Sequence, residues 1–76
     1  MTPLEKYYNE TIKRIAESDT PLFENDLDLF DTALLWSALE NTSLTKTTQK
    51  FLLRKFFTNK ITATYLARLI IAETGK

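Results

Sequence analysis

Glycine and proline, the residues that most readily interrupt regular structure, are scarce in this chain. Its 76 residues contain one glycine, Gly75, and two prolines, Pro3 and Pro21. So few turn-forming residues favour a small number of long regular segments. Apolar residues between these points recur mostly three or four positions apart, as on one face of an α-helix. The sequence therefore predicts an all-α fold.

Four helices are predicted, joined by short connections. Their expected ranges are about 3–17, about 26–41 after a cap at Asn25 or Asp26, a third that starts within 41–48 and stops before Asn59, and about 63–73. Thr2 and Thr62 are placed to cap the first and last helices, and Gly75 is placed to end the last one. Pro21 should begin a short helical piece carrying Leu22 and Phe23. We predict that residues 1–76 form one small four-helix, bundle-like domain.

The second helix carries apolar residues on two nearly opposite sides. One stripe consists of Leu27, Phe30, Leu34 and Ala38, and the other of Leu29, Ala33 and Trp36. A helix that is apolar on most sides is usually buried. In so short a chain, either this is the central helix, or it is half covered and its second stripe faces a partner.

Charged residues are sorted by their position in the sequence. Between residues 17 and 40 every charged residue is acidic, and between residues 46 and 68 every one is basic, although the formal net charge of the whole chain is zero. Such a polarised surface steers a partner and sets its orientation.

The acidic cluster at the start of the second helix has two interpretations. Asp26, Asp28 and Asp31 complement the positive end of the helix dipole there, or they form a negatively charged docking face. Their spacing also resembles the start of a calcium loop, but that loop needs a nearby glycine and a distant glutamate. No glycine is near, so we predict no metal site.

Enzymatic activity is not expected. The chain has no histidine and no cysteine, which excludes the commonest proton-transfer side chain and the usual nucleophile systems. A single glycine also excludes a glycine-rich phosphate loop. We predict no catalytic residue and no cofactor.

Basic residues form a stripe on the third helix. Lys46, Lys50 and Arg54 are spaced four residues apart, and Lys55 lies beside them. Contact between this stripe and phosphates would make the protein a nucleic-acid binder. Dedicated DNA-binding domains usually carry net positive charge, which this chain lacks.

Aromatic residues are numerous for so small a protein, with one tryptophan, three tyrosines and five phenylalanines. Most must be buried, but Trp36, Phe51 and one of the tyrosines are expected to stay exposed. Exposed aromatics beside charges are typical of protein interfaces. The predicted partner-binding residues are Trp36, Leu29, Phe51, Lys46, Lys50, Arg54, Lys55, Asp26, Asp28 and Asp31.

These features predict a small helical protein that binds another protein as a modulator, inhibitor or adaptor, of the kind found among bacterial and phage regulators. Nucleic-acid binding through the third helix is the alternative. We also expect the protein to self-associate into a homodimer, since opposite charges and surplus apolar surface both favour it. The chain has no apolar run of about 18–20 residues and no signal-peptide pattern, so we expect a cytoplasmic protein without a membrane partner.

Overall fold

The computed structural model of the protein describes residues 3–74, with side chains from residue 9 onward. Within this range the chain forms four α-helices and no strand: α1 (Pro3–Ala16), α2 (Leu29–Glu40), α3 (Lys46–Phe57) and α4 (Ala63–Thr74), with a short 3-10 helix, η1 (Glu24–Asp26), before α2. The all-α prediction is confirmed. The expected cap at Thr2 and the helix end at Gly75 lie outside the described residues. None of the helices in residues 3–74 combines the length and apolar character needed to cross a bilayer.

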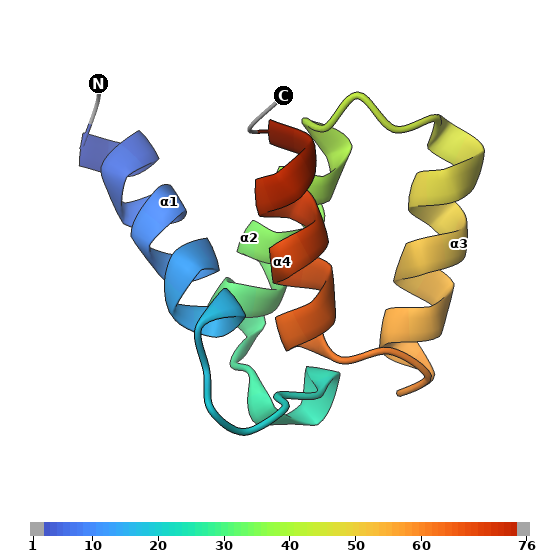
Figure 1. Ribbon diagram of the computed structural model, residues 1–76, viewed down its shortest axis with the longest axis horizontal. Coiled ribbons are helices and arrows are strands. Elements are labelled where there is room, and N and C mark those ends of the chain that lie inside the picture. The colour runs from blue at the N-terminus through green and yellow to red at the C-terminus, as the bar shows by residue number, and fades with distance from the viewer. Residues whose placement is uncertain (1–2, 75–76) are drawn as a thin grey trace.

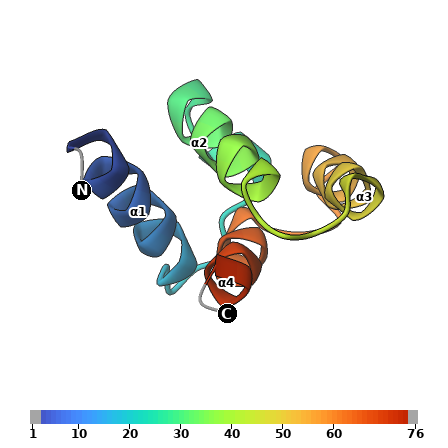
Figure 2. The same ribbon diagram turned by 90° about the horizontal axis from the view of Figure 1, so that it is seen from above.

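The helices form a compact, bundle-like arrangement. Helices α2 and α4 lie in the middle, and α1 and α3 flank them on opposite sides (Figure 1, Figure 2). The shortest dimension is 20 Å, about two helix diameters. A body this thin leaves one side of each helix close to solvent.

The core draws buried side chains from all four helices. The largest fully buried side chains are Ile15 of α1, Leu35 and Leu39 of α2, Phe56 of α3 and Leu66 of α4. Small residues of α4, Ala63 and Ala67, are also fully buried. Burial of these apolar groups is the main stabilising contribution to a domain of this size.

Local hydrogen bonds define the ends of α3 and α4. The Thr62 hydroxyl accepts from the Tyr65 N–H at 2.9 Å, which confirms the predicted cap of α4. Thr45 caps α3 by accepting from the Thr48 N–H. Asn59, with φ of 60°, ends α3 in a left-handed turn. There the Lys60 N–H donates to the Lys55 carbonyl at 2.8 Å, satisfying a carbonyl at the helix end.

The segment between α1 and α2 differs from its prediction. The helical piece expected at Pro21 is absent, because Leu22 bonds to α4: its carbonyl accepts from the Ala63 N–H at 2.6 Å, and its N–H donates to the Thr64 hydroxyl at 3.1 Å. A single 3-10 turn follows, in which the Asp26 carboxylate accepts from the Phe23 N–H.

The predicted start of the second helix was also wrong. Leu27 is extended, and α2 begins at Leu29 rather than near Asp26, with Asp28 as its cap. The Asp28 carboxylate accepts from the Asp31 N–H at 2.7 Å. The cap therefore lies two to three residues later than predicted. Asp28 at the cap and Asp31 in the first turn lie where the positive end of the helix dipole favours negative charge, whereas Asp26 precedes the helix.

Candidate protein-binding surface

Helix α2 lies in the middle of the bundle (Figure 1, Figure 2) but is only half covered. Its buried side chains are Asp31, Thr32, Leu35, Ala38 and Leu39, which share one side of the helix. The stripe of Leu29, Ala33 and Trp36 lies on another side and is exposed, with Leu29 at 87% and Trp36 at 48%. The second apolar stripe is therefore uncovered, as one of the two interpretations expected. Of the first stripe only Ala38 is buried, whereas Leu27 and Leu34 are half-buried and Phe30 is 54% exposed.

Helix α3 extends this apolar surface with Phe57. The Phe57 ring lies edge-on to the Trp36 ring, with 6.4 Å between centroids and 77° between planes. On its other side, the ring of Phe57 is 5.2 Å from that of Phe56, which is buried. Phe57 is thus held by the core and still 44% exposed. The spacing of Leu52, Leu53, Phe56 and Phe57 puts all four on one side of the helix and predicts that they are core residues. That prediction is wrong for Phe57.

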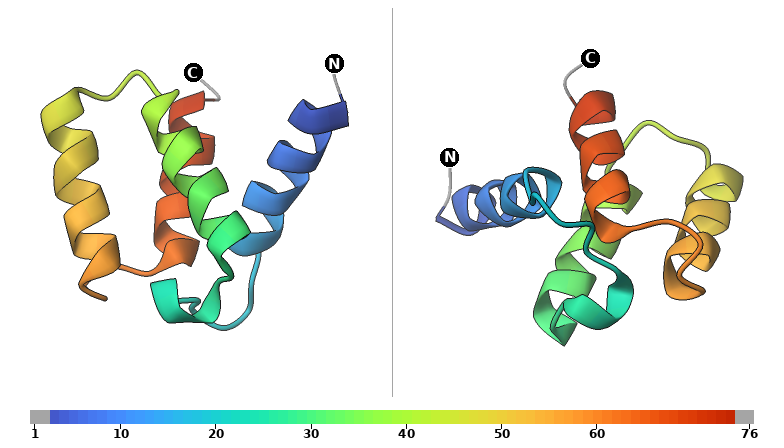
Figure 3. Two further views of the ribbon diagram at one scale, coloured as in Figure 1. Left: turned by 180° about the vertical axis from the view of Figure 1, so that it is seen from behind. Right: turned by 60° about the horizontal axis from the view of Figure 1, so that its bottom comes forward.

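A groove with two hollows runs between α2 and α3, which lie side by side and run in opposite directions (Figure 3). The larger hollow, of about 420 Å³, is lined mainly by Leu29, Ala33, Trp36 and Phe57. The smaller, of about 250 Å³, is lined by Trp36, Glu40, Lys46, Gln49, Lys50 and Leu53. Trp36 lines both and so stands in the middle. We call this surface the α2–α3 groove.

The two ends of the α2–α3 groove carry opposite charge. At the end near Leu29, Glu24 lines the hollow, and Asp26 and Asp28 are exposed close by in the sequence. At the end near Glu40, the smaller hollow is lined by Lys46 and Lys50. Glu40 lines the same hollow, so this end has two basic groups and one acidic group and remains net positive. At the other end, Glu24 is the charged residue that lines the larger hollow, and this end is net negative.

The structure brings together four of the residues predicted to bind a partner and separates the others. Trp36, Leu29, Lys46 and Lys50 line the α2–α3 groove. Phe51 is turned by about 100° from Lys50 around the helix axis, and Phe51 and Lys55 line neither hollow. These two form a pair of their own, in which the Lys55 ammonium lies 4.5 Å from the centroid of the Phe51 ring. Arg54 is exposed on the solvent side of α3 and lines neither hollow.

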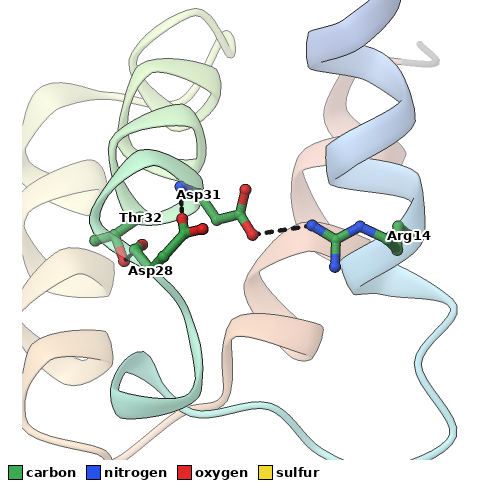
Figure 4. Close-up of polar contacts among 4 residues, drawn as sticks. All are labelled: Arg14, Asp28, Asp31 and Thr32. Carbon is green, nitrogen blue, oxygen red and sulfur yellow. Dashed lines mark hydrogen bonds and ion pairs between the residues drawn. The ribbon is translucent and has the colours of Figure 1, made fainter.

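The predicted acidic residues have structural roles. Asp26 and Asp28 are exposed but accept the backbone hydrogen bonds described above. Asp31 is buried, and its carboxylate accepts from the Arg14 guanidinium of α1 at 2.9 Å (Figure 4). Because Asp31 is engaged within the protein, we leave it out of the α2–α3 groove.

Glu24 and Phe57 also line the groove, although neither was among the predicted partner-binding residues. Glu24 reaches the groove through the irregular segment before α2, whose path no sequence pattern revealed. Among residues 9–74, whose side chains the structure describes, no group of three or more acidic side chains is close enough together to hold a metal ion. Comparison with protein-family models, curated proteins and solved structures found no match to this chain.

Proposed function

We propose that this protein acts without catalysis, by binding another protein in the α2–α3 groove, as a modulator, inhibitor or adaptor. The observation that carries the proposal is the exposed cluster of Leu29, Trp36 and Phe57 around one hollow. Monomeric soluble proteins rarely leave contiguous apolar patches uncovered without a use. Aromatic anchors in the middle of a patch are also the residues that contribute most to binding energy.

The charged ends support recognition of a protein more than of a nucleic acid. A phosphate backbone attracts a continuous basic surface, whereas this groove changes from net negative to net positive along its length. Lys46 and Lys50 would hold acidic groups of the partner at one end, and Glu24 would hold basic groups at the other. The cysteine-free composition is compatible with the reducing cytoplasm, which remains the proposed location.

The test is capture of partners from extracts of the source cells, with the wild-type protein compared with two variants. Trp36→Ala removes the central anchor of the groove. Tyr65→Ala is the matched control, because Tyr65 is also aromatic and 54% exposed but lies on α4. A specific partner should bind the wild type and Tyr65→Ala and be lost with Trp36→Ala. A partner retained by Trp36→Ala would contradict the proposed use of the groove.

A salt series with labelled duplex DNA tests the alternative function. Micromolar binding that weakens steeply with salt, and that is lost in the double variant Lys50→Gln with Arg54→Gln, would replace the present proposal. Absence of binding at low salt would remove the nucleic-acid alternative.

A further inference from the structure

We propose that a second copy of this chain occupies the α2–α3 groove, forming a reversible two-fold dimer with Trp36 close to the axis. The inference rests on the proposed function in that both use the same groove for protein binding. It goes further by naming the occupant and by making the free groove depend on concentration.

The charges of the groove are self-complementary. A two-fold axis through the middle of the groove turns the second copy end for end. Glu24 of each copy then faces the net positive hollow of the other, where Lys46 and Lys50 outnumber Glu40, and this contact is made twice. In a two-fold interface every pair of facing residues recurs by symmetry. A groove with equal charge at both ends would repel its own copy in this arrangement.

The apolar groups match under the same rotation. Trp36 lines both hollows, so it is the side chain nearest the axis. Leu29, 87% exposed, turns toward the smaller hollow of the other copy, which has Leu53 and the lysine side chains as its walls. A projecting leucine that enters a facing hollow resembles the packing of knobs into holes between helices.

The size of the groove sets the strength of the dimer. Helix α2 has 12 residues, so the groove is about 18 Å long at 1.5 Å per residue. Such a contact buries less than the roughly 800 Å² per partner of a stable interface. We therefore expect a dissociation constant in the range of about 10–500 µM, typical of weak and transient contacts. At low concentration the groove is free for a different partner, and at high concentration the protein itself covers it.

The first experiment is sedimentation equilibrium of the wild-type protein up to 1 mM, with the emission of Trp36, the single tryptophan, recorded in parallel. We expect a monomer–dimer equilibrium and a shift of the emission to shorter wavelength as the dimer forms. A protein that stays monomeric at 1 mM overturns the proposal.

Charge reversal tests the two-fold arrangement. Glu24→Lys and Lys50→Glu should each weaken self-association by about 30-fold, because each change converts two attractive contacts into repulsive ones. An equimolar mixture of the two variants should regain association, since each then faces the opposite charge. Glu10→Lys, which reverses an exposed charge on α1, is the control and should dimerise like the wild type.

Three results would overturn the proposal: no recovery in the mixture, equal weakening by Glu10→Lys, or an unchanged dimer in Trp36→Ala. The proposed function fails separately. If the wild type dimerises as described while capture of partners does not depend on Trp36, the groove serves self-association alone. Circular dichroism of each variant establishes that it is folded.

Discussion

The Arg14 guanidinium and the Asp31 carboxylate form an ion pair at 2.9 Å that joins α1 to α2, and its two partners differ sharply in exposure. The Arg14 side chain is 62% exposed, whereas that of Asp31 is 12% exposed. Removing the Asp31 carboxylate leaves a hydrated cation, whereas removing the Arg14 guanidinium leaves a mostly buried anion. The cost of removing each partner should therefore differ.

We expect Arg14→Met to lower the free energy of unfolding by about 1–2 kcal/mol, because it keeps the apolar part of the side chain but leaves Asp31 without its charged partner. Asp31→Asn should cost about 0.5 kcal/mol, because the exposed Arg14 is then solvated by water. Urea unfolding followed by circular dichroism measures both. Equal losses would show that the buried carboxylate does not depend on Arg14.

The cap of α2 gives a second prediction. Asp28→Ala should lower the free energy of unfolding by about 1 kcal/mol, because the Asp31 N–H loses its acceptor. Asp28→Asn keeps an oxygen in place and should stay within a few tenths of a kcal/mol of the wild type. Thermal unfolding of the two variants side by side checks this. A large loss in Asp28→Asn would mean that the negative charge matters more than the hydrogen bond.

Asn59 tests the turn that ends α3. Its φ of 60° is tolerated by asparagine and glycine but costs about 1 kcal/mol for other residues. We expect Asn59→Ala to lower the free energy of unfolding by about 1 kcal/mol and Asn59→Gly to change it little. The comparison needs only chemical unfolding curves, and a neutral alanine variant would argue against a left-handed residue at this position.

Leu35 and Trp36 are neighbours in the sequence with opposite expected effects. Leu35 is fully buried, so Leu35→Ala should cost about 2–5 kcal/mol of stability. Trp36 is 48% exposed, so Trp36→Ala should cost about 1 kcal/mol or less and instead abolish binding in the α2–α3 groove. Unfolding curves and binding assays on the same two variants separate these effects. A Trp36→Ala protein as unstable as Leu35→Ala would identify Trp36 as a core residue.

Much of the fold could be predicted from the sequence because helices are encoded locally. The periodic spacing of apolar residues gave the four helices, and Thr62 marked the start of α4 because its cap is formed by residues three positions apart. The segment before α2 could not be predicted in this way. Its conformation depends on hydrogen bonds from Leu22 to Ala63 and Thr64, some 40 residues away.

The groove was predictable only in part, for the same reason. The second apolar stripe of α2 and the basic stripe of α3 are both visible in the sequence. Periodicity alone does not say which stripes of two helices meet. Phe51 was therefore predicted to bind the partner together with Trp36, whereas the orientation of α3 places Phe57 beside Trp36 instead.

The hydrogen bond from the Ala63 N–H to the Leu22 carbonyl has a consequence for how this protein opens. Amides in the first turn of a helix usually exchange rapidly with solvent, because they have no partner within the helix. Here the Ala63 amide is held by a distant segment. Its exchange requires the Leu22 segment to detach, so the beginning of α4 and the connection between α1 and α2 should exchange together as one cooperative unit.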